Sequence, residues 1–171
     1  VALDVQDAQH VERMYEKIIR RAKQAQPEAE IRGVTVQPMA AAEHGVELIL
    51  GAKQDRTFGS VMLVGLGGTA AEVLEDRVLG LPPLNERLAR QMLTSLRGWP
   101  LLEGHRGGPG VDLDRLVEVL VGLSYLIADH PQIRALDINP LLAAPDRAVA
   151  LDARVIVDPD KLDQSVPPYP H

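Results

Sequence analysis

Apolar residues recur along the chain at the spacing of helices in some stretches and of strands in others. Val11, Met14 and Ile18 repeat every three or four positions, which predicts an amphipathic helix over residues 8–24 with Asp7 as its N-cap. Pro27 is expected to end this helix, because proline cannot donate a backbone hydrogen bond.

The same helical spacing returns in the second half of the chain. Asn85 can cap a helix over 85–96, which the pair Trp99-Pro100 is expected to end. A longer helix is predicted from Asp112 or Asp114 to about residue 129. Its inward residues are expected to be Leu116, Val119, Leu120, Leu123, Leu126 and Ile127.

Between these helices lie short runs that are rich in β-branched and other apolar residues. They predict strands over 34–39, 46–53 and 60–66, a possible return strand within 71–81, and a hairpin over 134–157. Strands that alternate with helices and hairpins indicate an α/β or α+β domain, with a mixed sheet flanked by helices.

Composition narrows the function classes. The hydrophobic fraction of 46% can supply a core, and the net charge of −6, without a basic cluster, argues against a nucleic-acid groove. The chain has no cysteine, so disulfides and thiol chemistry are excluded. No apolar run approaches the roughly 20 residues of a membrane span, so neither nucleic acid nor membrane is an expected partner and a cytoplasmic protein is predicted.

The hairpin near the C-terminus carries the most informative polar residues. A turn at Pro145 and Asp146 would place Asn139 opposite Asp152 and Asp137 opposite Arg154, with Asp137 and Asn139 on one face. Such oxygen donors suit Mg²⁺, which also keeps positions for water and phosphate. An exposed edge hairpin in which Arg154 pairs with Asp137 is an equally good interpretation of the residues alone.

The segments L-D-I-N-P-L and A-L-D-A-R in this hairpin resemble the metal-binding end of an ATP-grasp domain. The resemblance is to the NDP-forming acyl-CoA synthetases, relatives of the succinyl-CoA synthetase β subunit. It extends over about residues 11–157 and includes G-V-T-V-Q-P-M, V-E-L-I-L-G-A, F-G-S-V-M-L-V-G-L-G-G and L-L-E-G-H-R-G, in that order. It implies the C-terminal part of an ATP-grasp fold: residues 1–39 as the end of the small lobe and hinge strand, 40–158 as the large lobe, and 159–171 as a linker.

The resemblance also implies roles for individual residues. Asn139 and Asp152 would hold Mg²⁺, Asp137 would help to hold an incoming phosphohistidine, and Arg106 would have a catalytic or phosphate-related role. The nucleotide-binding residues would be Val36, Gln37 and Met39 beside the adenine, Glu47 near ribose or phosphates, and the glycines Gly65, Gly67 and Gly68. Each group has a purely structural alternative: an ordinary strand, a surface glutamate and a tight turn.

The implied function is ATP binding in an ADP-forming acyl-CoA synthetase. ATP would phosphorylate a histidine on a CoA-binding partner domain, and the phosphoryl group would pass on to an acyl phosphate and then yield acyl-CoA. None of the five histidines matches the phosphohistidine context, and the phosphate-gripping lysine of the family is not found. We therefore expect the isolated chain to fold, to bind ATP–Mg²⁺ weakly and to catalyse nothing. The alternative is a non-catalytic domain of a GNAT-type protein lysine acetyltransferase, since P-P-Y-P-H resembles the linker of such fusions.

Overall fold

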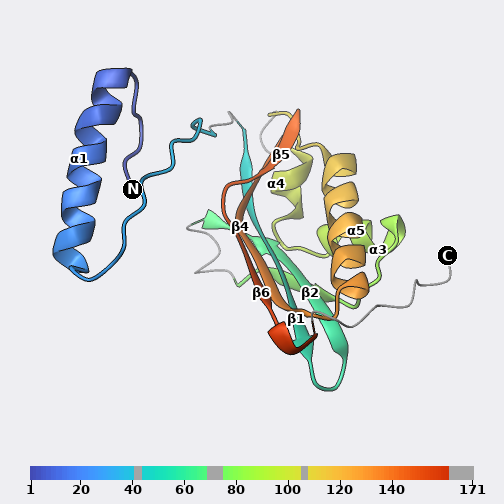
Figure 1. The fold of residues 1–171 in the computed structure, drawn as a ribbon. Helices are drawn as coiled ribbons and strands as arrows, with labels where there is room; N and C mark the ends of the chain where they lie inside the picture. Colours follow the sequence, from blue (N-terminus) through green and yellow to red (C-terminus); the bar gives the residue numbers. More distant parts are fainter. Residues whose placement is uncertain (41–43, 69–74, 105–107, 162–171) are drawn as a thin grey trace. The chain divides into compact units, whose positions relative to one another are not determined.

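The computed structural model describes residues 1–40, 44–68, 75–104 and 108–161. The chain divides into two compact units, Val1–Ala40 and Ala41–His171, which we describe separately (Figure 1). This division falls close to the boundary expected between residues 39 and 40, while the assignment of the two units to ATP-grasp lobes stays a prediction.

The first unit is built around helix α1, Ala8–Ala25. The Asp7 carboxylate accepts the backbone N–H of His10 at 2.7 Å, so the predicted N-cap is confirmed. The predicted strand over residues 34–39 is wrong, because this segment has no regular secondary structure. A strand needs a backbone partner, and the described residues of this unit contain no other strand with which the segment could pair.

The second unit contains an antiparallel sheet, and its strands bear out the predicted fold class. In sequence order the strands are β1 Val46–Asp55, β2 Gly59–Leu66, β3 Arg77–Gly80, β4 Ile133–Ala144, β5 Arg147–Ala150 and β6 Ala153–Val157. They lie in the order β3-β2-β1-β4, and β4 then pairs with both β5 and β6 along its other side. Every pairing between these described strands is antiparallel, whereas a mixed sheet was predicted.

Helix α3, Glu86–Thr94, follows β3, and the short helix α4, Trp99–Glu103, follows α3. The side chain of Asn85 accepts the Leu88 N–H at 2.9 Å, which confirms it as the N-cap of α3. The pair Trp99-Pro100 was predicted to end a helix, but in the structure it begins α4. Proline is tolerated there because the first backbone N–H groups of a helix have no intrahelical partner.

Helix α5, Leu113–Asp129, is capped by Asp112, whose carboxylate accepts the Arg115 N–H at 2.9 Å. Its buried stripe includes Leu116, Leu120, Leu123 and Ile127, as predicted. Leu126 was expected to point inward, but its side chain is 40% exposed. The reason is geometric: at about 100° per residue, the four buried residues lie within about 60° of the helix surface, and residue 126 lies about 60° outside that arc. A 3-10 turn, Pro159–Lys161, ends the described part.

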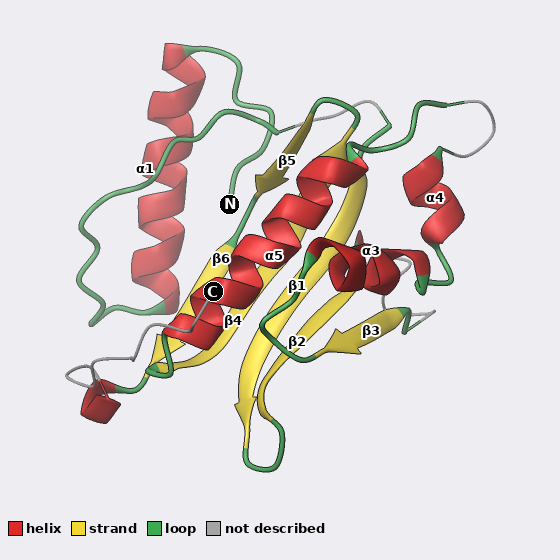
Figure 2. Ribbon diagram, turned by 90° about the vertical axis from the view of Figure 1, so that its right-hand side faces the viewer, coloured by secondary structure: helices red, strands yellow, loops and turns green. Residues whose placement is uncertain are grey.

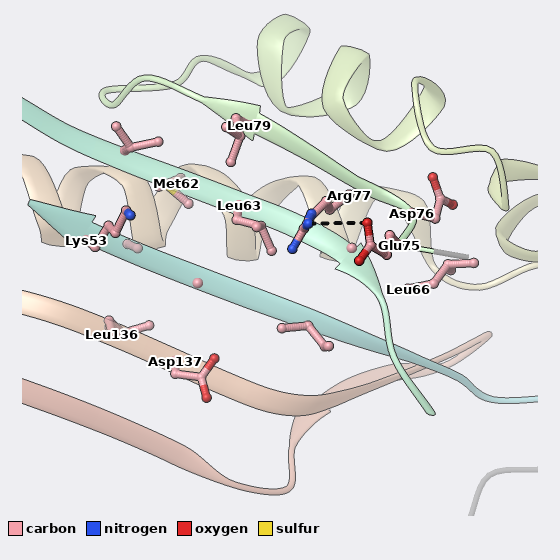
Figure 3. Close-up of a pocket in the computed structure, with 15 residues that line it drawn as sticks. Lys53, Met62, Leu63, Leu66, Glu75, Asp76, Arg77, Leu79, Leu136 and Asp137 are labelled. Carbon is pink, nitrogen blue, oxygen red and sulfur yellow. Dashed lines mark ion pairs between the residues drawn. The ribbon is translucent and has the colours of Figure 1, made fainter. Parts of the chain in front are cut away.

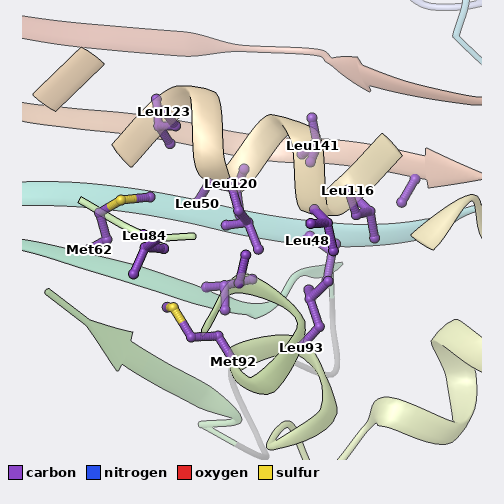
Figure 4. Close-up of a cluster of buried hydrophobic side chains, with 14 of the residues drawn as sticks. Leu48, Leu50, Met62, Leu84, Met92, Leu93, Leu116, Leu120, Leu123 and Leu141 are labelled. Atoms are coloured by element: carbon purple, nitrogen blue, oxygen red, sulfur yellow. The ribbon is translucent and has the colours of Figure 1, made fainter. Parts of the chain in front are cut away.

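The hydrophobic core lies between one face of the sheet and helices α3 and α5 (Figures 2 and 4). Leu48 and Leu50 of β1, together with Met62 of β2, are at most 1% exposed and pack in one cluster with Leu93 and Leu120 from the helices. Ile49, Gly51 and Lys53 of β1 and Leu63 of β2 alternate with these and are more exposed. The sheet therefore has one face covered by helices and a second face that the described helices of this unit leave open.

Candidate functional site

The acidic hairpin has the register that the sequence predicted. Asp137 pairs with Arg154 and Ile138 with Ala153, while Leu141 pairs with Ala150. Between these pairs the Asn139 N–H donates to the Asp152 carbonyl at 3.1 Å. Asn139 of β4 therefore lies directly opposite Asp152, which belongs to the short gap between β5 and β6.

Asp137 and Asn139 are exposed and alternate along β4 with Leu136 and Ile138, which pack in or against the core. The two polar residues therefore belong to the open face of the sheet. The ion pair between Asp137 and Arg154, which the alternative interpretation required, is absent from the ion pairs of the described residues. The Asp137 carboxylate thus has no charged partner within this part of the chain, although Arg154 faces it in the register.

The open face carries a groove of about 520 Å³ (Figure 3). Its floor is the outward side of β1 and β2, with Gly51 and Lys53 on one strand and Leu63 and Gly65 on the other. Asp137 lies at one side of this groove and Arg77 of β3 at the other. This groove runs between Gly65 and Asp137, and Asn139 and Asp152 are not among the residues that line it.

A buried aspartate fixes the β3 side of the groove. The Asp76 carboxylate accepts the backbone N–H groups of Arg97 and Gly98, both at 2.8 Å, and only 6% of this residue is exposed. The Asp76 carbonyl accepts the Leu66 N–H at 3.0 Å. Asp76 thereby ties the start of β3 to the end of β2 and to the turn before α4. It also positions its neighbours Glu75 and Arg77, whose side chains form an ion pair at 3.6 Å in the groove.

The glycines predicted to bind phosphate do not all lie in one place. Gly65 lines the groove on the open face, whereas Gly67 and Gly68 line a second groove of about 630 Å³ together with Glu47. The Gly67 N–H already donates to the Glu47 carbonyl at 2.7 Å, so it is not free to bind phosphate. Gly68 has a φ of +68° and lies beside the Glu47 carboxylate. The structure thus brings Glu47 and these two glycines together.

Four predicted residues remain: three belong to the first unit, and the fourth is Arg106. Val36, Gln37 and Met39 line a cavity of about 210 Å³ inside the first unit, which the apolar stripe of α1 also lines. Arg106 lies outside the described residues, as does most of the predicted linker.

Three residues of the groove on the open face are absent from the residues predicted from sequence: Gly51, Lys53 and Arg77. The alternation of apolar and other residues along β1 and β2 could have shown which residues face outward, because it separates the core side of each strand from its outward side. What could not be read from the alternation was which strands are neighbours, and therefore that residues of β1, β3 and β4 share one groove.

The donors at Asn139 and Asp152 fit a hard cation such as Mg²⁺. One amide oxygen and one carboxylate are held opposite each other by the backbone, both residues are exposed, and the described residues offer neither side chain a hydrogen bond. The described part contains no group of three or more His, Cys, Asp or Glu residues placed to hold a metal. The protein would therefore supply few ligands and leave other positions to phosphate oxygens and water, which is the way Mg²⁺ is usually held.

The class of protein follows from comparison of this chain with known families. Residues 1–157 match the model of the ATP-grasp domain family, and the chain belongs to this family. It is homologous to the β subunits of ADP-forming acetyl-CoA synthetases. It is 34% identical over 160 residues to subunit beta of acetate–CoA ligase [ADP-forming] II from Pyrococcus furiosus, covering 92% of this chain and 67% of the relative.

Two solved structures extend the comparison, both of dinucleotide-forming acetyl-coenzyme A synthetase 1 from Ca. Korarchaeum cryptofilum. The first contains coenzyme A, acetyl-coenzyme A and a phosphorylated phosphohistidine segment. It is 33% identical in sequence to this chain, and the two structures superpose with a TM-score of 0.84 over 91% of this chain and 69% of that one. The second contains coenzyme A and Mg-AMPPCP and has its phosphohistidine segment pointing towards the nucleotide site. It is 27% identical in sequence to this chain, and the two structures superpose with a TM-score of 0.75 over 91% of this chain and 67% of that one.

The chain thus spans about two thirds of the length of these relatives. The comparisons support the ligase interpretation and give no support to the acetyltransferase alternative. Within the described residues, no helix is both long enough and apolar enough to cross a membrane.

Proposed function

We propose that this chain is the nucleotide-binding part of an ADP-forming acyl-CoA synthetase. In this enzyme ATP phosphorylates a histidine on a CoA-binding domain, and the phosphoryl group then reaches the acyl acid before CoA takes its place. The observation that carries the proposal is the arrangement at β4: Asp137, without a charged partner, lies on the groove face beside Asn139, which faces Asp152.

In this proposal the groove on the open face receives the phosphate end of ATP. Asn139 and Asp152 are the residues that would hold Mg²⁺, and the chemistry that the ion supplies when bound is neutralisation of charge on the phosphates. Lys53 adds positive charge to the same groove, where the charge of Arg77 is paired with Glu75. Most of the catalysis of phosphoryl transfer comes from such positioning and charge, which is why the residues of the groove matter more than any single acid or base.

Asp137 is proposed to act on the histidine. Its carboxylate accepts the N–H of one imidazole nitrogen, which selects the tautomer whose other nitrogen has a free lone pair. That nitrogen attacks the terminal phosphorus, the bond from phosphorus to the ADP oxygen breaks, and ADP leaves with the bonding electrons. The partner is therefore a histidine-bearing, CoA-binding domain of the same protein or of a second subunit, as the phosphohistidine segment of a homologue suggests.

The nucleotide residues outside the groove have more limited roles. We propose that Val36, Gln37 and Met39 contact the adenine through their exposed side chains and backbone, and that Glu47 with Gly67 and Gly68 lies near the ribose or phosphates. Gly67 would let the nucleotide come close to the backbone, but it would not donate its N–H, because this N–H is already bonded to the Glu47 carbonyl. Arg106 keeps the phosphate-related role that its motif implies, and a cytoplasmic location stays a prediction.

The test is Asp152→Asn in the complete protein. The substitution keeps the size of the side chain and removes its charge, so ATP-dependent formation of the CoA thioester should be abolished while folding is unchanged. Asp160→Asn is the matched control, since Asp160 is an exposed acid in the 3-10 turn that follows the hairpin. Wild-type activity in the Asp152→Asn protein would show that the metal is held elsewhere.

A further inference from the structure

Gly51 lies in the interior of β1, where folding gives no reason for a glycine. Its φ is not in the left-handed region, and a Cβ added to it would meet only the Leu136 carbonyl oxygen and the Leu63 Cβ, both at 3.9 Å. That distance is an ordinary van der Waals contact. A glycine inside a strand nevertheless weakens the strand, because it loses more backbone entropy on folding and offers no side chain to pack.

Other glycines of the same sheet have a steric explanation that Gly51 lacks. A Cβ on Gly65 would lie 2.8 Å from the Asp76 carbonyl oxygen, and one on Gly67 would lie 3.1 Å from the Glu47 backbone. These two positions need glycine because another strand segment passes close to them. At Gly51 the space that glycine leaves empty is instead the groove on the open face.

The neighbours of Gly51 show what this space adjoins. Gly51 pairs in register with Asp137 on one side and with Leu63 on the other. Lys53, the next residue of β1 on the same face, also lines the groove. Neither Asp137 nor Lys53 forms an ion pair with any described residue, so a carboxylate and an ammonium group remain available beside a stretch of bare backbone.

The order of positions along β1 separates the metal pair from this space. Leu48 pairs with Leu141 and Leu50 with Ile138, so the irregular part of β4 that contains Asn139 lies beside Ile49. Gly51 is the next position on the same face, opposite Asp137. A phosphate held at Asn139 and Asp152 would therefore lie on the Ile49 side, and the group that accepts the phosphoryl would lie over Gly51.

We propose that Gly51 is a specificity-determining residue that keeps the acceptor side of the groove open. The imidazole of the incoming histidine lies over the β1 backbone at Gly51, between Leu63 and Asp137. Its N–H donates to Asp137. Any side chain at position 51 would lift the ring from the floor and displace its attacking nitrogen from the phosphorus. This inference rests on the proposed function and adds a residue to it.

The experiment compares Gly51→Ala and Gly51→Val with the wild type in the complete protein. Two quantities are measured: the dissociation constant of Mg²⁺–AMPPCP by calorimetry, and the rate of histidine phosphorylation from radiolabelled ATP in a single turnover. Nucleotide affinity should stay within about twofold. Phosphorylation should fall about tenfold for alanine and about a hundredfold or more for valine, because misplacing a reacting group by about 1 Å can cost that much.

Gly122→Ala is the matched control, since Gly122 lies in α5 with open space around its added Cβ and outside the groove. It should change neither quantity, and thermal melting should show all the variants folded. Unchanged phosphorylation in Gly51→Val would overturn the inference, and so would a parallel loss of nucleotide affinity, which would place the nucleotide itself over Gly51. A wild type that binds no nucleotide would instead refute the proposed function.

Discussion

The two faces of the sheet in the second unit are made by the same strands but have opposite properties. On the covered face, Leu48, Leu50 and Met62 are almost fully buried against α3 and α5. On the open face, the alternating positions of the same strands include Gly51, Lys53 and Leu63, which line a groove. The difference shows that one face supplies the core while the other is free to carry charged and small residues, which we propose bind a ligand.

The largest expected effect on stability comes from the covered face. Leu120 of α5 is 1% exposed in the core, and Leu120→Ala should lower the free energy of unfolding by about 3 kcal/mol, since it removes buried methyl groups and leaves a cavity. Urea denaturation gives the value. Lys53→Ala on the open face should change it by less than about 0.5 kcal/mol, as exposed substitutions usually do. Equal losses in the two variants would mean that the two faces are not distinct in this way.

An intermediate effect is expected where the open face meets a structural constraint. Gly65→Ala should cost about 1–3 kcal/mol, because its Cβ would press on the Asp76 carbonyl, which belongs to the backbone and cannot rotate away. Gly51→Ala should leave stability unchanged within about 0.5 kcal/mol or raise it slightly. The two midpoints of urea denaturation, measured side by side, check this contrast. If Gly65→Ala is as stable as the wild type, the close approach of Asp76 is not a constraint.

The smallest effect concerns the turn between β1 and β2. The backbone N–H groups of Thr57 and Phe58 donate to the Asp55 carboxylate at 2.8 and 3.1 Å and lower its pKa. Because the folded-state pKa lies below the unfolded value, this contribution to stability is complete above the unfolded pKa of about 3.9 and is lost as the pH falls through the folded pKa.

Asp55→Ala should therefore be slightly less stable than the wild type near pH 7, and this difference should shrink below about pH 4. Unfolding curves at a series of pH values measure it, with Arg56→Ala in the same turn as the control. A difference that grows as the pH falls would contradict the assigned hydrogen bonds.

Much of the fold was predictable because its signals are local. The caps at Asp7, Asn85 and Asp112 and the register of the hairpin around Asp146 depend on neighbouring residues only, and all four agree with the structure. The segment 34–39 was misassigned because strand propensity alone does not supply a pairing partner. Leu126 was wrongly expected to point inward, because its position falls outside the arc that Leu116, Leu120, Leu123 and Ile127 share.

The candidate site was predictable only in part. Asp137, Asn139 and Asp152 come from a single hairpin, so their proximity follows from sequence. Gly51 and Arg77 join Asp137 through the strand order β3-β2-β1-β4, which depends on long-range packing. The separation of Gly65 from Gly67 and Gly68 has the same origin, since it depends on how the end of β2 meets Glu47 and Asp76.

The central claim is that nucleotide binds on the open face of the sheet, and amide NMR of the 171-residue chain titrated with Mg²⁺–ATP tests it most directly. Weak binding is sufficient for this measurement. Chemical-shift changes should be largest for Ile49, Asn139 and Asp152, and small for the middle of α5. Changes centred on α5, or an absence of changes on β1 and β4 at saturating nucleotide, would contradict the claim.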